Sequence, residues 1–149
     1  MSKPFALQAV LDLMQRRADD ATQRLARLIA AEQDASTKLT LLTDYREEYA
    51  RRFQSSAQEG LTPQQWRNFQ DFLGRLDDAI DQQREVVTRS RQNTATGQQE
   101  WQRQQVKLKA MDTLSDRHQQ SETRRELHQE QKLIDEIAAR GRKAREDPS

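Results

Sequence analysis

The fold is decided by one stretch of the sequence, Gln54-Ser55-Ser56-Ala57-Gln58-Glu59-Gly60-Leu61-Thr62-Pro63-Gln64-Gln65. It is the one place in the chain where a glycine and a proline fall close together, and such combinations mark turns. Thr62 is a typical helix N-cap, Pro63 suits the first helical position, and Gln65 stands where a capping box requires a glutamine or glutamate. The stretch therefore predicts the end of one helix, a short turn and the start of a second helix.

Before this turn, apolar residues recur at alternating steps of four and three, which average to the 3.5-residue period of a coiled coil. Two charged residues, Glu32 and Arg46, interrupt the pattern. We expect this face of the first helix to pack against the second helix as a seam. The predicted seam positions are Leu7, Leu11, Met14, Ala18, Ala21, Leu25, Leu28, Glu32, Ala35, Leu39, Leu42, Arg46, Tyr49 and Phe53.

After the turn, the same spacing predicts a second seam that is apolar near the turn and again from Trp101 onward. Between about residues 88 and 100 the positions are polar and include Gly97, and a glycine inside a helix costs about 1 kcal/mol relative to alanine. We therefore expect looser packing or a bend in that stretch. The predicted positions are Trp66, Phe69, Leu73, Leu76, Ile80, Gln83, Val87, Ser90, Thr94, Gly97, Trp101, Gln104, Leu108 and Met111.

Two coiled-coil helices joined by a short link must fold back on each other, so the predicted fold is all-α: a long antiparallel two-helix coiled coil, or helical hairpin. We predict a single coiled-coil domain over residues 1–149, with helix one at about 4–57, the turn at about 58–62 and helix two at about 63–140. The C-terminal end, which carries Leu127, Leu133, Ile134 and Ile137, is expected to overhang or to be ordered only on a partner.

The composition agrees with a thin helical protein rather than a compact globule. Hydrophobic residues make up 34% of the chain and charged residues 33%, and the mean hydropathy is −1.12, which leaves too little apolar material for a large core. The net charge of +1 provides no general attraction for nucleic acid or acidic lipid. Residues from Met1 to Phe5 lack the apolar stretch of a signal peptide, and no segment is long and apolar enough to span a membrane. We expect a cytoplasmic protein without direct membrane insertion.

No residue pattern predicts catalysis. The chain has no cysteine, which excludes thiolate nucleophiles and thiolate metal sites. It has no glycine-rich phosphate loop and no nucleophile elbow. The two histidines, His118 and His128, lack the spacing of a metal site, and we expect both to be exposed. We therefore predict a protein that is not an enzyme and has no cofactor and no metal.

One flank of the predicted hairpin is unusually apolar near the turn. With Leu39 at heptad position a, Tyr45 falls at position g, and Phe72, Ala79 and Val86 fall at the g positions of the second helix. Charged residues usually occupy these positions. The residues either widen the core and seal the hairpin or form an exposed patch that binds a partner, and the spacing alone leaves both interpretations open.

Basic residues gather towards the other end of the first helix, at Arg16, Arg17, Arg24 and Arg27. They form either a solvated helix surface, since acidic residues are interspersed among them, or a docking site for an acidic protein surface. The short basic run at residues 140–145 is weak support for nucleic-acid binding in a chain that is almost neutral. We expect no nucleic-acid partner.

Two stretches flank the turn: Leu42-Thr43-Asp44-Tyr45-Arg46-Glu47-Glu48-Tyr49 and Trp66-Arg67-Asn68-Phe69-Gln70-Asp71-Phe72-Leu73-Gly74-Arg75-Leu76-Asp77-Asp78-Ala79-Ile80. Both resemble the FliJ family of the bacterial flagellar export apparatus. The resemblance continues through Trp101 and through residues 108–117, and it includes the Phe5-Ala6-Leu7 start. It covers nearly the whole chain through the joint spacing of its aromatic and leucine residues.

The resemblance implies a fold like the γ stalk of rotary ATP synthases and a role in flagellar type III protein export. Members of this family bind the central hole of the hexameric flagellar export ATPase with the end that carries both termini. They also contact the cytoplasmic linker of the export-gate protein FlhA and escort flagellar export chaperones. The implied location is the cytoplasm, peripherally at the inner membrane of the flagellar base. The arginines Arg16, Arg17, Arg24 and Arg27 are the candidates for the ATPase contact.

The resemblance also implies a gate-binding patch. In this sequence the patch comprises Leu42, Tyr45, Tyr49, Phe72, Leu76 and Ala79. At two further patch positions Lys38 and Gln83 replace the glutamine and histidine that the family pattern leads us to expect. Two alternatives stay open at this point: the equivalent stalk protein of a virulence type III secretion system, and a plain structural coiled coil.

Overall fold

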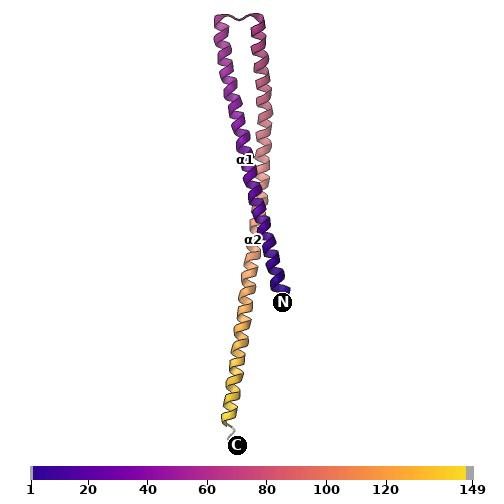
Figure 1. Cartoon of the computed structure of the whole chain (residues 1–149), viewed down its shortest axis with the longest axis vertical. Helices are drawn as coiled ribbons and strands as arrows, with labels where there is room; N and C mark the ends of the chain where they lie inside the picture. The colour runs from indigo at the N-terminus through magenta and orange to yellow at the C-terminus, as the bar shows by residue number, and fades with distance from the viewer. Residues whose placement is uncertain (1, 147–149) are drawn as a thin grey trace. The chain divides into compact units, whose positions relative to one another are not determined.

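The computed structural model describes residues 2–146, with side chains from Ala6 to Glu146. It consists of two helices, α1 (Ser2–Glu59) and α2 (Pro63–Glu146), and no strand occurs within that range. A short loop at residues 60–62 joins the helices, which run antiparallel from it (Figure 1). The all-α helical hairpin is confirmed. The predicted domain ends at Met1 and Ser149 lie outside the described residues.

The chain divides into two compact units. The hairpin unit, Ala18–Gln104, contains the loop and the parts of both helices that flank it. The second unit contains the described residues up to Arg17 and from Gln105 onward. Neither helix, over the described residues, has a stretch that is apolar and uncharged enough to cross a lipid bilayer.

The loop has the predicted capping chemistry. The Thr62 hydroxyl accepts a hydrogen bond from the Gln65 amide at 3.2 Å, and the Thr62 amide donates to Gln65 Oε1 at 3.1 Å. This reciprocal pair satisfies two amides that a helix start leaves without intrahelical partners. Gly60 ends α1 with a φ of 103°, a conformation that side chains disfavour. The capping box predicted at Thr62 and Gln65 is confirmed.

The predicted seam of α1 faces inward along its described length. Every predicted seam position from Leu7 to Phe53 is buried or half-buried, and Ala18, Ala21 and Ala35 are the most enclosed. The two charged interruptions are both neutralised from α2: Arg46 Nε lies 2.9 Å from Asp77 Oδ1, and Glu32 Oε1 lies 3.8 Å from Arg91 Nε. An ionic side chain at a seam position is thus paired across the helix interface rather than left without a counter-charge.

The polar part of the α2 seam also contacts α1, through hydrogen bonds. Gln83 Nε2 donates to the Ala35 carbonyl at 2.9 Å, and Thr94 Oγ1 lies 3.3 Å from the Leu28 carbonyl. Trp101 Nε1 donates to Thr22 Oγ1 at 3.0 Å. These bonds join the two helices where apolar side chains are scarce, and they can form only in one register.

The expectation of looser packing is wrong for Gly97. Gly97 is buried, and a Cβ atom placed on it would lie 2.5 Å from Leu28 Cδ1. The missing side chain therefore lets Leu28 approach the α2 backbone closely. The glycine acts here as a packing position rather than as a weak point.

Two further expectations need correction. Trp66 was predicted to belong to the seam, yet it is 43% exposed, because it lies in the first turn of α2 beside the open loop end. His118 was predicted to be exposed, yet it is half-buried, with Nε2 3.9 Å from Glu122 Oε1. His118 follows Met111 and Ser115 at steps of four and three, so the seam spacing continues through it. His128 is exposed as expected.

We expect replacement of Gly74 by alanine to raise the free energy of unfolding by about 0.5–1 kcal/mol, because alanine has the higher helix propensity. Gly74 is exposed, and nothing lies within 4 Å of its would-be Cβ. Gly97→Ala should gain less or lose stability, because Leu28 must shift to admit the methyl group. Urea unfolding followed by circular dichroism measures both. Equal gains in the two variants would contradict the close packing of Leu28 on Gly97.

Candidate functional site

Aromatic rings concentrate at the loop end of the hairpin. Tyr45, Tyr49 and Phe53 recur every four residues on α1, and Trp66, Phe69 and Phe72 recur every three on α2. Both spacings keep side chains on one helical face. The rings of α1 contact those of α2 in antiparallel order, and the distances that follow are between ring centroids. Nearest the loop, Phe53 lies 4.9 Å from Trp66 and 5.2 Å from Phe69. Further along, Tyr49 lies 5.2 Å from Phe69 and 4.5 Å from Phe72, and Tyr45 lies 6.2 Å from Phe72.

These contacting rings, which we call the aromatic ladder, pack α1 against α2 at the loop end. Rings at such distances in tilted or edge-to-face arrangements stabilise one another by about 0.5–1.5 kcal/mol per pair beyond the area they bury. The partly exposed ring of Tyr45 contacts two rings of the ladder, those of Tyr49 and Phe72, and these contacts support it. Spacing of aromatic residues at i+3 and i+4 was the signal in the sequence, although the resemblance drew attention only to part of the set.

The predicted gate-binding residues lie together at this end but differ in accessibility. Tyr45 is 46% exposed, and its ring forms a T-shaped contact with the ring of Phe72. Leu76 is buried in the seam. The remaining residues are half-buried, namely Leu42, Tyr49, Phe72 and Ala79. Tyr45 is thus the member of the set most available to a partner, and the binding role of the set stays a prediction.

Further apolar side chains extend this surface. Val86, two turns beyond Ala79 at the same heptad position, is 39% exposed, and Leu41 on α1 is 63% exposed. We call Tyr45, Phe72, Ala79 and Val86 the apolar flank. The sequence left open whether this flank widens the core or forms an exposed patch, and the structure shows a mixture. Phe72 and Ala79 are half-buried, whereas Tyr45 and Val86 are exposed to solvent.

The two positions that depart from the family pattern have different roles in the structure. Lys38 is exposed. Gln83 is half-buried, and its side-chain amide donates to the Ala35 carbonyl. Gln83 therefore contributes to the register of the hairpin, whereas Lys38 is open to solvent.

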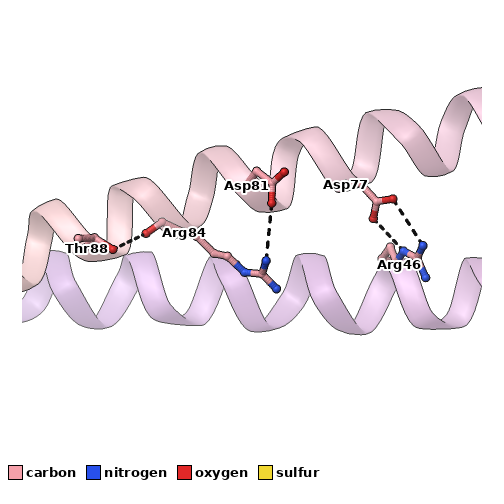
Figure 2. A network of polar contacts seen from close by, with 5 residues as sticks. All are labelled: Arg46, Asp77, Asp81, Arg84 and Thr88. Atoms are coloured by element: carbon pink, nitrogen blue, oxygen red, sulfur yellow. Dashed lines mark hydrogen bonds and ion pairs between the residues drawn. The ribbon is translucent and has the colours of Figure 1, made fainter.

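The opposite flank of the hairpin is polar and its charges are paired. Arg46 binds Asp77 with two contacts, Nε to Oδ1 at 2.9 Å and Nη2 to Oδ2 at 3.5 Å. Figure 2 shows Arg46 reaching Asp77 across the two helices, while Arg84 extends towards Asp81 on its own helix, 3.6 Å away. The backbone carbonyl of Arg84 also accepts a hydrogen bond from the Thr88 hydroxyl. Because paired charges satisfy each other, this flank offers a partner less than the apolar flank does.

The candidate ATPase-binding arginines are all exposed. Arg16 and Arg17 belong to the second unit, and Arg24 and Arg27 belong to the hairpin unit. Within the hairpin unit Arg24 lines a shallow depression beside Leu28, Gly97 and Arg103. Their binding role also stays a prediction. Among residues 2–146 no group of three or more histidine or acidic side chains could hold a metal ion.

Comparisons with known proteins agree on one family. A family model described as "Flagellar FliJ protein" matches residues 2–146. The chain is 31% identical to the flagellar FliJ protein of Salmonella typhi over 140 residues, which cover 94% of this chain and 95% of that protein. It is 30% identical to the flagellar FliJ protein of Escherichia coli K12 with the same coverage. It is 26% identical over 102 residues to the flagellar FliJ protein of Buchnera aphidicola, over 68% of this chain and 67% of that protein.

Proposed function

Since the chain belongs to the flagellar FliJ family, we propose that it is a non-enzymatic component of the flagellar type III export apparatus. In this proposal it is a central stalk that binds the hexameric export ATPase through its terminal residues and the FlhA linker through the apolar flank near the loop. The nucleotide site belongs to the ATPase ring. The stalk couples the conformation of that ring to the export gate.

The observation that carries the proposal is the apolar flank. A two-helix coiled coil has no third layer to cover side chains at its g positions, so exposed apolar residues there favour a protein partner. Tyr45 has the features of a binding hot spot: it is aromatic, partly exposed and held by the rings of Tyr49 and Phe72. Leu42, Tyr49, Leu76 and Ala79 complete the proposed contact by supporting this surface or forming its edge.

The exposed arginines support the ATPase contact. Guanidinium groups form paired hydrogen bonds with carboxylates, so Arg16, Arg17, Arg24 and Arg27 suit an acidic lining in the ring. Two further parts of the proposal extend the family assignment: the chain escorts flagellar export chaperones, and it acts in the cytoplasm, peripherally at the inner membrane of the flagellar base. The flagellar relatives favour this system over a virulence type III secretion system.

Co-purification tests the proposal. The full chain, mixed with the flagellar export ATPase and with the cytosolic part of FlhA including its linker, should be retained by each partner separately. An unrelated helical hairpin of similar charge provides the control. Retention by neither partner would overturn the stalk proposal, and a plain structural coiled coil would then be the better description.

We expect replacement of Arg16, Arg17, Arg24 and Arg27 together by alanine to raise the chain concentration needed for half-maximal stimulation of the ATPase by about tenfold, or 1.4 kcal/mol. The control variant replaces four exposed arginines near the loop, Arg51, Arg52, Arg67 and Arg75. That variant should stimulate the ATPase normally. Equal stimulation by the two variants would contradict the assignment of the ring contact to the first four arginines.

A further inference from the structure

The seam spacing of α2 ends within the second unit. Met111, Ser115, His118 and Glu122 are half-buried and follow one another at steps of four and three. The same spacing continues to Arg125, Gln129, Lys132 and Glu136, all of which are polar and exposed. Every described side chain from Thr123 to Glu146 is exposed. The last six turns of α2 are therefore not part of the hairpin seam.

These turns nevertheless carry large apolar side chains. Leu127, Leu133, Ile134 and Ile137 are 57–61% exposed, and we call them the C-terminal stripe. Leu127 and Ile134 are seven residues apart and Ile137 follows three later, so they define a new heptad with a at 127, 134 and 141 and d at 130, 137 and 144. At about 100° per residue, this heptad is rotated by roughly 140° from a continuation of the hairpin seam. The stripe is thus a separate surface.

The charges beside the stripe are arranged in two blocks. Apart from Lys132, the charged residues from Glu126 to Glu136 are acidic, at Glu126, Glu130, Asp135 and Glu136. The block that follows is basic, at Arg140, Arg142, Lys143 and Arg145. A parallel copy of this segment would set like charges side by side, whereas an antiparallel copy sets the basic block beside the acidic one.

We propose that a second copy of this chain covers the C-terminal stripe through an antiparallel coiled coil of residues 126–140. In the matching register Leu127 packs against Ile137 of the second copy, and Leu133, at position g, meets its own equivalent close to the two-fold axis. Glu126 and Arg140 are also g positions, and in an antiparallel pair g faces g. Glu126 of each copy therefore contacts Arg140 of the other copy. The two equivalent contacts lie on either side of the Leu133 pair. This association goes beyond the export role and does not depend on it.

Sedimentation equilibrium of the full chain tests the association, at about 0.15 M salt and from about 1 to 200 µM. The apparent mass should rise from the 17.5 kDa of one chain towards twice that value. Ile134→Asp should keep the chain monomeric over the range. Arg140→Glu should weaken dimerisation about tenfold, and Glu126→Arg combined with Arg140→Glu should restore it. Lys132→Glu, a matched charge reversal at the outer f position, should leave it unchanged.

Cross-linking tests the antiparallel register, because the chain contains no native cysteine. Leu133→Cys should form a disulfide-linked dimer on mild oxidation. Leu127→Cys should not, because the two copies of residue 127 lie roughly 15 Å apart along the helix axis in this register. A monomer at every concentration would overturn the proposal. So would a dimer that cross-links through Leu127→Cys, or one that Phe72→Ala dissociates while Ile134→Asp does not.

Discussion

Replacement of Ile80 by alanine is expected to lower the free energy of unfolding by about 2–4 kcal/mol. Ile80 is 6% exposed and lies in the apolar part of the α2 seam, between Leu76 and Val87, which are buried as well. Its removal leaves a cavity that a two-helix structure has few neighbouring side chains to fill. Because small domains are stable by only about 5–15 kcal/mol, the loss is a large share of the total. Urea unfolding followed by circular dichroism at 222 nm measures it.

Leu41→Ala is the matched control, since it removes the same number of carbon atoms from a side chain that is 63% exposed on α1. The free energy of unfolding should change by less than about 0.5 kcal/mol. If the two variants lost similar amounts, the seam would not be the source of the hairpin's stability. The comparison also separates burial from helix propensity, because alanine is the better helix former at both positions.

The spacing of apolar residues was sufficient to predict the fold and most of the buried face. It was sufficient because the 3.5-residue period has one physical cause, the need of each helix to keep one face against the other. Even Glu32 and Arg46, which looked like faults in the pattern, occupy half-buried positions in the structure. Their partners Arg91 and Asp77 lie on α2, about sixty and thirty residues away along the chain. Only the register of the hairpin brings these charges together.

The polar part of the seam could not be evaluated from residue types. Gly97 lowers helix propensity in any helix, and propensity contains no information about the helix packed against it. The benefit of Gly97 depends on Leu28, and that of Gln83 and Thr94 depends on carbonyl groups of α1. Such contacts are properties of the folded register. A residue that is weak for a single helix can therefore be favourable in a pair.

The candidate site was predictable in position but not in accessibility. Heptad positions placed Tyr45, Phe72 and Ala79 on one flank, and the family resemblance gave that flank a partner. Neither showed that Leu76 would be buried while Tyr45 stayed 46% exposed. Exposure depends on how far each ring leans over the seam, and that depends on the contacts among Tyr45, Tyr49 and Phe72. The structure therefore identifies Tyr45 as the residue to substitute first.

Tyr45→Ala is expected to weaken binding of the chain to the cytosolic part of FlhA by roughly thirtyfold, or about 2 kcal/mol, as for an aromatic hot spot. The exposed part of the ring is the surface that a partner would cover, and its contacts with Tyr49 and Phe72 hold it in place. Phe72→Ala should also weaken binding, since it removes the ring that supports Tyr45. Isothermal titration calorimetry with the FlhA fragment that includes its linker measures both affinities.

Two controls decide whether such a loss comes from the apolar flank. Tyr45→Phe keeps the ring and should bind nearly as well as the unmodified chain, because the proposed contact is mainly apolar. Trp66→Ala removes a ring of similar exposure that contacts Phe53 in a tilted arrangement near the loop and has no ring contact with Tyr45. This variant should leave the affinity unchanged. If Tyr45→Ala and Phe72→Ala bound FlhA normally while both variants stayed helical, the gate contact would lie elsewhere on the chain. If only Trp66→Ala lowered the affinity for FlhA, the binding surface would lie at the loop and not on the apolar flank.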